Sequence, residues 1–313
     1  MSRKLVKQGK DTLTVSLPKN WCDKNRLNSG DEVDFEELKS GLLIKNKAVT
    51  DDKLEVNLEG LNYLTKRYIR SIGRLGFDTV VIYNKNPDVI KEIQESLEKD
   101  LFGYEIILQD DFKTVIKNMS FMKSDQFYDS LRRNSDVTKS MIEGLKESIV
   151  KIDTTKIESV LYLEKTNNKI MSFCKSILFN DTKFSKKESI ILYGILEYLE
   201  KICDELRYLG IYIKEKSPEI KKINKDIPKA FDKLSELFSL FYSYFLDNDL
   251  RLVESYPKYR LINYELLNNV PVKTSVETAI VHYLMTMLNH IGSSFYQALK
   301  LKIVLGQDKH VLK

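Results

Sequence analysis

Residues 120–305 contain the feature that most constrains this chain: apolar side chains recur every three or four positions with few interruptions. This spacing is typical of amphipathic helices that bury one face in a bundle. The whole chain has only 12 glycines and 6 prolines in 313 residues, which favours long helices. Turn-forming residues predict five breaks, and therefore six helices. The breaks are expected near Asp153 and within residues 180–185, 216–228, 247–249 and 268–271.

The six predicted helices form two sets of three. The third helices of the two sets have similar apolar spacing, in LEKICDELRYLGIYI from Leu199 and in LNHIGSSFYQALKLK from Leu288. Such self-similarity indicates that a three-helix unit is repeated. We therefore predict a multidomain, mainly α protein whose helical domain, residues 120–305, contains units of about 120–216 and 228–305 in an antiparallel bundle.

Residues 52–118 have a different rhythm. LEVNL, TVVIY and YEIILQD are predicted strands, and LNYLTKRYIRSIGRLG and DVIKEIQESLEKD are predicted helices between them. The order predicts a small α/β (βαβαβ) connecting domain with a three-stranded sheet covered by two helices. No glycine-rich phosphate loop follows a strand, and we interpret Gly73 and Gly76 as helix terminators.

Residues 1–48 are predicted to be β-rich. RKLVKQ, TLTVSL, EVDFEEL and GLLIK are the predicted strands, and a short helix is expected to begin at Pro18 between the second and third. A unit of this size cannot bury its own apolar face, so it needs a partner. A second copy of the chain is the simplest partner.

The positive charge of the chain is concentrated at its start. The net charge is +5, and residues 1–30 contain seven basic and two acidic residues. The other 283 residues contain 43 basic and 43 acidic residues, so they contribute no net charge. Such a concentration favours binding to a phosphate backbone or another anionic surface. The alternative is a basic end that is merely solvated.

Several classes of protein are disfavoured by what the sequence does not contain. The three cysteines are far apart, so we expect no disulfide framework and a reducing compartment. Neither a signal peptide nor an apolar run of membrane-spanning length is present, so a cytoplasmic protein without membrane insertion is expected. Neither a nucleophile elbow, an HExxH motif nor a Walker loop occurs, and we expect no enzymatic activity.

The stretch RKLVKQGKDTLTVSLPKNWCDKNRLNSGDEVDFEEL resembles AbrB/MazE-type swapped-hairpin DNA-binding domains. A basic first strand, a turn, an alternating strand that ends in LPK, a short helix and SGDEV support the resemblance. It implies a homodimer of interleaved hairpins that presents basic loops to DNA. The candidate DNA contacts are Arg3, Lys4, Lys7, Lys10, Thr12, Lys19 and Asn20.

The helical part resembles the PhoU-like phosphate uptake regulators. YLEKICDELRYLGIYI is similar to their third-helix motif, in which a glutamate precedes an aspartate by four positions, here Glu200 and Asp204. The arrangement as a whole resembles archaeal phosphate uptake regulators. It implies a DNA-binding regulator of phosphate uptake whose helical part relays phosphate status through a phosphate transporter or signalling component. The alternative is a metal-dependent adaptor that regulates a transporter through protein contacts and does not bind DNA.

The resemblance also implies metal ligands, because the second and third helices of each PhoU unit can supply carboxylates to metal clusters. The first unit contains Glu164, Glu200 and Asp204, with Asn168 in place of a second acid, whereas the second unit lacks these acids. Three carboxylates and an amide could hold Mg²⁺ or Ca²⁺, and the resemblance implies Fe³⁺ as a further candidate. The alternative is that Glu200 and Asp204 are solvated or pair with the nearby Lys201 and Arg207.

Overall fold

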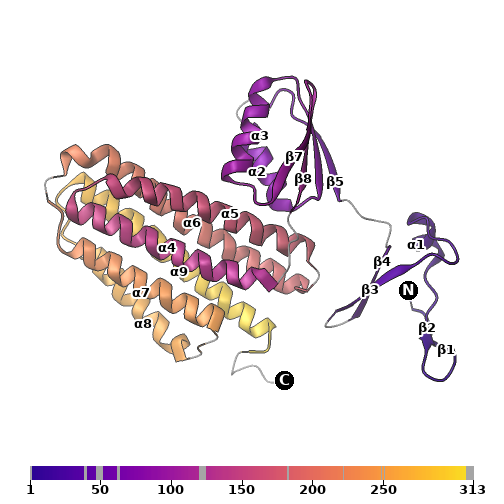
Figure 1. The fold of residues 1–313 in the computed structure, drawn as a ribbon. Helices are drawn as coiled ribbons and strands as arrows, with labels where there is room; N and C mark the ends of the chain where they lie inside the picture. Colours follow the sequence, from indigo (N-terminus) through magenta and orange to yellow (C-terminus); the bar gives the residue numbers. More distant parts are fainter. Residues whose placement is uncertain are drawn as a thin grey trace. The chain divides into compact units, whose positions relative to one another are not determined.

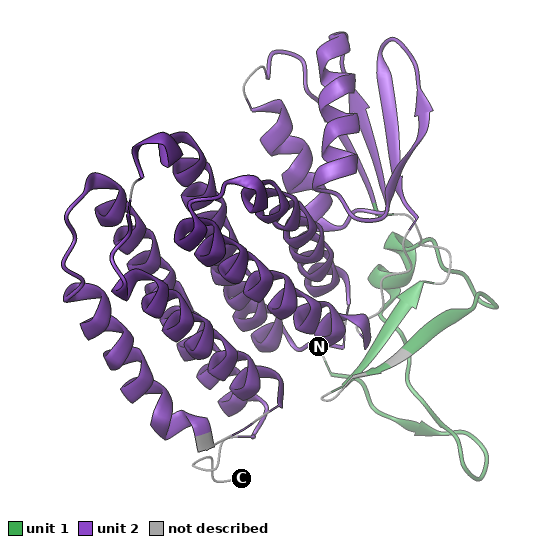
Figure 2. Ribbon diagram, turned by 60° about the vertical axis from the view of Figure 1, so that its left-hand side comes forward, with its two compact units in different colours: residues 1–52 green, residues 53–313 purple. Residues whose placement is uncertain are grey.

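The computed structural model describes residues 2–38, 41–46, 52–61, 64–119, 125–181, 183–220, 222–247, 249 and 251–307. The chain divides into two compact units, which we call unit 1 (residues 1–52) and unit 2 (residues 53–313) (Figure 2). Unit 2 contains a small α/β part and a large helical bundle (Figure 1). The predicted mainly α, multidomain class is therefore confirmed.

Unit 1 contains two short antiparallel pairs of strands and one helix. Its elements are β1 (Val6–Lys7), β2 (Leu13–Thr14), α1 (Lys19–Lys24), β3 (Val33–Leu38) and β4 (Gly41–Asn46). β1 pairs with β2, and β3 pairs with β4. The strand predicted over residues 12–17 is shorter than expected, because β1 provides a partner only for Leu13 and Thr14.

The α/β part of unit 2 contains a four-stranded sheet. Its elements are β5 (Lys53–Asn57), α2 (Thr65–Leu75), β6 (Thr79–Tyr83), α3 (Pro87–Lys99), β7 (Tyr104–Gln109) and β8 (Lys113–Asn118). The strand order is β5-β6-β8-β7, with β5 parallel to β6 and β8 antiparallel to both of its neighbours. The predicted three-stranded βαβαβ pattern is therefore wrong, because the sheet contains a fourth strand, β8.

The missed strand, KTVIKN, follows a tight turn after β7. Asp110 fixes this turn, since its Oδ1 accepts from the backbone N–H groups of Phe112 and Lys113 at 2.9 and 2.8 Å. Val115 and Ile116 are adjacent rather than alternating, so the segment has only a weak strand pattern of its own. Its position between β6 and β7 supplies the hydrogen bonds that make it a strand.

Helices α2 and α3 share one hydrophobic core with the sheet. Ile69, Ile93, Ile82 and Ile116 are fully buried in it. The prediction for Gly73 as a terminator is wrong, because it lies inside α2, where an added Cβ would be 1.9 Å from Cδ2 of Leu101. The prediction for the other glycine is confirmed, since Gly76 ends α2 with a left-handed φ of 76°.

The helical bundle has six long helices among the described residues, as predicted. They are α4 (Asp125–Lys151), α5 (Thr155–Asn180), α6 (Lys186–Lys216), α7 (Asp226–Asp247), α8 (Arg251–Asn268) and α9 (Ser275–Val304), with a short 3₁₀ turn, η1 (Ser217–Glu219), after α6. The five predicted breaks are all present between them. In the described part of the chain, no helix combines the length and apolar character that crossing a bilayer requires.

The helices of the bundle share one hydrophobic core. Helices α4, α5 and α6 pack against one another, and so do α7, α8 and α9. The most extensive contact joins α6 to α9, and α4 also packs on α7. The α/β part is attached to this bundle through α2 and α3, which both contact α5.

Candidate functional site

The predicted DNA contacts lie on two segments of unit 1. Lys7 lies on β1, and Lys10 lies in the turn that joins β1 to β2, where Gly9 adopts a left-handed φ of 79°. Lys19 and Asn20 form the first turn of α1 directly after Pro18. Each predicted contact is exposed: Arg3, Lys4, Lys7, Lys10, Thr12, Lys19 and Asn20.

These two segments do not form one surface in a single chain. The turn that contains Lys10 and the start of α1 lie at opposite ends of the stretch 12–17, as both ribbon views show (Figures 1 and 2). The hairpin is closed by a hydrogen bond from the Gln8 N–H to the Thr12 carbonyl at 2.8 Å. The basic residues of one chain therefore lie in two separate groups, one at the hairpin and one at the start of α1.

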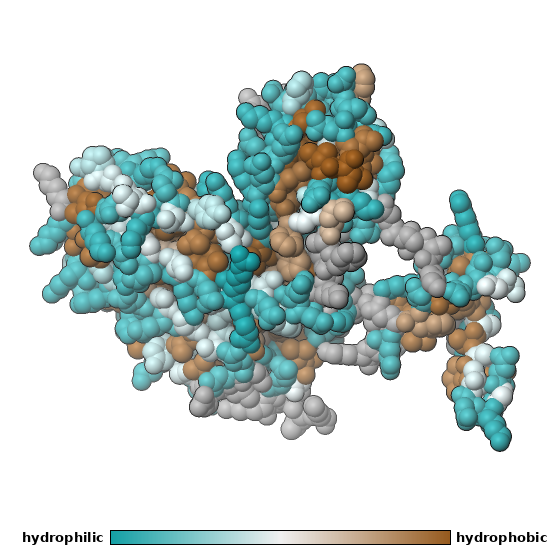
Figure 3. Space-filling view, in the orientation of Figure 1, coloured by the Kyte–Doolittle hydropathy of each residue, from teal (hydrophilic) through white to brown (hydrophobic). Residues whose placement is uncertain are grey.

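Unit 1 has no core of its own among its described residues, none of which is buried. Large apolar side chains are exposed on both of its strand pairs: Val6 by 60% and Leu13 by 62% on the first, Phe35 by 60% and Leu42 by 57% on the second. Figure 3 shows hydrophobic surface on this unit. Exposed apolar patches of this kind are typical of interaction surfaces.

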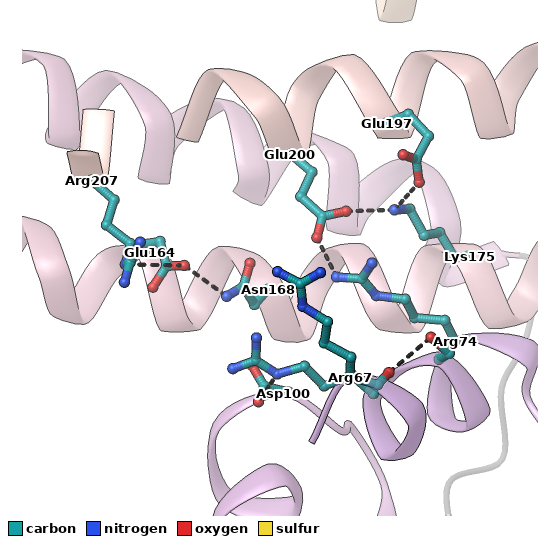
Figure 4. A network of polar contacts seen from close by, with 11 residues as sticks. Arg67, Arg74, Asp100, Glu164, Asn168, Lys175, Glu197, Glu200 and Arg207 are labelled. Atoms are coloured by element: carbon teal, nitrogen blue, oxygen red, sulfur yellow. Dashed lines mark hydrogen bonds and ion pairs between the residues drawn. The ribbon is translucent and has the colours of Figure 1, made fainter. Parts of the chain in front are cut away.

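A second site lies where the α/β part meets the bundle, and its centre is Glu200 on α6 (Figure 4). Only 9% of this residue is exposed. Its Oε1 accepts a hydrogen bond from Nη2 of Arg74, which comes from the last turn of α2. Its Oε2 accepts from Nζ of Lys175 on α5. Two cations from two different elements therefore neutralise one buried carboxylate.

Lys175 is the buried partner that the sequence pattern did not reveal. Its side chain is 0% exposed, and its Nζ also donates to the carboxylate of Glu197, one turn before Glu200 on α6. Burial raises the pKa of Glu197, but the hydrogen bond and the charge of Lys175 lower it by more. The pKa of Glu197 is therefore below its ordinary value. Its surroundings in the sequence could have indicated a buried charge, since Lys175 is the one charged residue in the run MSFCKSILF.

The other predicted ligands lie further along the same helices. Nδ2 of Asn168 donates to Oε1 of Glu164 at 2.8 Å, and Nε of Arg207 lies 3.9 Å from the same oxygen. Burial raises the pKa of Glu164. Burial also raises the pKa of Asp204 to about 6, and the negative charges of Glu200 and Glu164 add to this effect. The two carboxylates therefore lie in surroundings that favour their protonated forms.

The four predicted ligands do not fit a metal ion in this arrangement. Cations bind both carboxylate oxygens of Glu200, and an amide binds one oxygen of Glu164. Within the described residues, no group of three or more histidine, cysteine, aspartate or glutamate side chains is placed to hold a metal. Lys201, the expected partner of Glu200, instead lies over the ring of Tyr198.

The contacts around Glu200 hold the α/β part against the bundle. Nδ2 of Asn180, at the end of α5, donates to the carbonyl of Gly76 at 2.8 Å. The ring of Phe102, in the loop before β7, packs edge-on against that of Phe173 on α5, with centroids 5.0 Å apart. Polar and aromatic contacts thus accompany the Arg74–Glu200 ion pair between the α/β part and the bundle.

No protein-family model matches this chain, and no curated protein sequence has significant similarity to it. The candidate sites are therefore defined by the chain's own residues and contacts.

Proposed function

We propose that this protein is a dimeric, DNA-binding transcription regulator of phosphate uptake. Unit 1 contacts DNA, and the helical bundle relays phosphate status. The observation on which this proposal mainly depends is the combination found in unit 1, which contains exposed basic residues and exposed apolar residues but no buried residue among those described. A concentrated basic surface favours an anionic partner, and an uncovered apolar surface favours a protein partner.

The charge of unit 1 suits a phosphate backbone. The basic side chains of residues 1–30 lie on or just before the β1–β2 hairpin and at both ends of α1, and all of them are exposed. Each phosphate that a lysine neutralises releases condensed counterions, so binding of this kind weakens steeply as salt rises. Thr12 and Asn20 add neutral hydrogen-bond donors next to the charged groups.

A second copy of the chain is the proposed cover for the apolar residues of unit 1. Isolated two-stranded hairpins are marginally stable in water, and unit 1 consists of two such hairpins with one short helix. Interleaving two copies, as in the swapped-hairpin domains that the sequence resembles, would bury Val6, Leu13 and Phe35. It would also combine four basic segments instead of two.

The proposed relay in unit 2 depends on the resemblance of the bundle to two PhoU-type units. Two sets of three helices that pack internally and then against each other support this assignment. Glu200 and Asp204, the motif residues, both lie at or beside the contact with the α/β part. The proposed partner of the bundle is a component of a phosphate transporter or of its signalling chain.

The DNA assignment is tested with the full chain and a triple variant, Lys7→Ala, Lys10→Ala and Lys19→Ala. Its matched control is Lys91→Ala, Lys186→Ala and Lys187→Ala, which removes the same charge from exposed positions in unit 2. Fluorescence anisotropy with labelled duplex DNA is measured at several salt concentrations. We expect the first variant to bind more weakly, and its log-log salt slope to fall by about 0.9 for each phosphate that is no longer neutralised.

The control variant is expected to retain both the affinity and the salt slope of the parent. Equal weakening of the two variants would mean that binding reflects total charge rather than the surface of unit 1. Absence of binding by the parent at low salt would refute the DNA assignment and leave the adaptor hypothesis, in which unit 1 serves only for dimerisation.

A further inference from the structure

Helix α2 has three arginines on one side, Arg67, Arg70 and Arg74. Their spacing of three and four positions puts them on one face of the helix. The helix contacts α5 of the bundle directly. Figure 4 shows the side chains of Arg67 and Arg74 extending from α2 toward the bundle helices. The arginine face of α2 is therefore turned toward the bundle.

This face meets the acidic residues to which the sequence resemblance assigns metal ions. Arg74 binds one oxygen of the Glu200 carboxylate, and Lys175 binds the other. One turn earlier on α2, Nε of Arg70 donates to Oδ2 of Asp100 at 2.6 Å. Asp100 is itself buried, so this second ion pair lies within the same contact region. Guanidinium groups thus bind carboxylates at two successive turns of α2.

The charges of α2 also act on the other two predicted ligands. Burial has the largest effect on the pKa of Glu164 and raises it, whereas the charges of Arg207 and Arg70 lower it. Burial likewise raises the pKa of Asp204 to about 6, against the charges of Arg207 and Arg74. Helix α2 therefore supplies positive charge to every carboxylate of the predicted metal site.

The second three-helix set has an arginine at the equivalent position. Asn289 stands in LNHIGSS where Glu200 stands in LEKICDE. Nη2 of Arg260, on α8, donates to Oδ1 of Asn289 at 3.3 Å. Gly292 leaves room for the arginine, since an added Cβ would lie 2.7 Å from its Nε. A guanidinium group therefore binds the third helix of each set.

A metal ion at the first site would have to displace cations that are part of the chain. Arg74 and Lys175 would repel it at short range. Both belong to the folded protein, so they compete at the high effective concentration of an intramolecular contact. Metal ligands must also be deprotonated, whereas burial favours the protonated forms of Glu164 and Asp204.

We infer that the acids of the first three-helix set bind the arginine face of α2 in place of metal ions, so that the α/β part is attached to the bundle by an interface that needs no metal. The inference goes beyond the proposed function, because it assigns a partner to the acidic motif. It does not depend on DNA binding by unit 1. It also removes the metal requirement from the adaptor alternative.

The first experiment measures the metal content and the thermal unfolding of the full-length protein, purified without a chelator. Elemental analysis is expected to find far less than one ion of magnesium, calcium or iron per chain. Addition of EDTA, MgCl₂ or CaCl₂ is expected to leave the Tm unchanged. About one ion per chain that is lost in Glu200→Gln would overturn the inference, and so would a lower Tm of the parent in EDTA.

The second experiment replaces the arginine. Arg74→Ala is compared with Arg132→Ala, which removes an exposed ion pair with Asp247 inside the bundle. We expect the Tm to fall by about 5 °C in Arg74→Ala and to change little in the control. Ethylguanidinium chloride at about 20 mM, above a millimolar dissociation constant, should restore part of this loss in Arg74→Ala only. MgCl₂ at the same concentration should restore none.

Two outcomes of the second experiment would overturn the inference. Equal Tm values for Arg74→Ala and Arg132→Ala would mean that the contact with Glu200 does not hold the two parts together. Rescue of Arg74→Ala by MgCl₂ but not by ethylguanidinium would mean that the acids prefer a metal ion. Arg74→Lys provides a second variant that retains the charge without the fork of donors, and its Tm is expected to lie between those of Arg74→Ala and the parent. The metal content of the parent decides the question even where Arg74→Ala does not fold.

Discussion

At the scale of single residues, Lys175 determines how the bundle tolerates its buried carboxylate. Glu200 is almost inaccessible to water, and an uncompensated charge there would be expensive. Arg74, from the α/β part, and Lys175, from α5, each bind one of its carboxylate oxygens. The bundle itself therefore supplies one of the two cations that neutralise Glu200, and the α/β part supplies the other.

We predict that Lys175→Met destabilises the bundle by about 3 kcal/mol. The buried carboxylate of Glu200 then keeps Arg74 but loses one of its two cations, and Glu197 loses its hydrogen bond from Lys175. The measurement is urea unfolding followed by far-ultraviolet circular dichroism. The control is Lys214→Met, which removes an exposed ion pair with Glu158 and should cost no more than about 1 kcal/mol. Equal costs would show that the burial of Lys175 does not matter.

Asp204 is predicted to make stability depend on pH. Its pKa is raised from 3.8 to about 6, so the folded state binds this proton more tightly than the unfolded state does. Between these two pH values, stability therefore falls as pH rises. The full shift corresponds to about 3 kcal/mol, and solvent screening of this partly exposed group reduces it to about 1–2 kcal/mol.

Asp204→Asn should accordingly be more stable than the parent above pH 6 and should lose this part of the pH dependence. Thermal unfolding across pH 4 to 8 measures both effects. The exposed aspartate Asp136, on α4, provides the control variant Asp136→Asn. If the parent and Asp204→Asn had parallel pH profiles, the buried environment assigned to Asp204 would be wrong.

At the scale of elements, the junction between α2 and α5 depends on a glycine. Gly76 has φ of 76°, and a Cβ at this position would lie 2.2 Å from Nδ2 of Asn180 and 2.9 Å from Cβ of Ser176. An alanine would therefore be strained in its backbone and would push α5 away from the end of α2. Glycine alone combines a left-handed φ without strain with the absence of a Cβ next to Asn180 and Ser176.

Gly76→Ala is predicted to destabilise the junction by more than the ~1 kcal/mol that a left-handed alanine costs by itself. Gly60→Ala separates the two effects, because Gly60 has a similar φ of 80° but open space around its Cβ position. Hydrogen exchange should become faster in α2 and in the last turns of α5 with Gly76→Ala only. Faster exchange there in both variants would assign the effect to backbone strain.

The sequence predicted elements well where the signal is local. Periodicity and turn residues located all six bundle helices, because a helix is defined by neighbours three and four positions apart. The strand β8 was missed because its partners, β6 and β7, decide its structure. The same reason explains the site: the resemblance identified Glu200 and Asp204 through a motif that is local in the sequence, whereas their contacts with Lys175 and Arg74 join distant segments.

At the scale of the whole molecule, the exposed apolar residues of unit 1 predict a dimer. Sedimentation equilibrium should give twice the chain mass of 36.5 kDa. Leu13→Lys and Phe35→Lys, each at a position about 60% exposed in one chain, should lower this mass toward that of a monomer. Tyr162→Lys is the control, since Tyr162 is 70% exposed on α5 of the bundle. A monomeric parent, or dissociation caused by the control, would contradict dimerisation through unit 1.

The contact between α6 and α9 has a consequence for how the protein is made. The ring of Tyr198 on α6 lies 6.0 Å from that of His290 on α9, and the two helices form the most extensive contact of the bundle. On the ribosome, α6 is complete long before residues 275–304 have been translated. During that interval the side of α6 that packs on α9 is uncovered, whereas α4 and α5 are already available to cover the rest. Exposed apolar surface is the condition under which nascent chains recruit chaperones. A translation pause within α7 or α8 would prolong this exposure and lower the yield of folded protein.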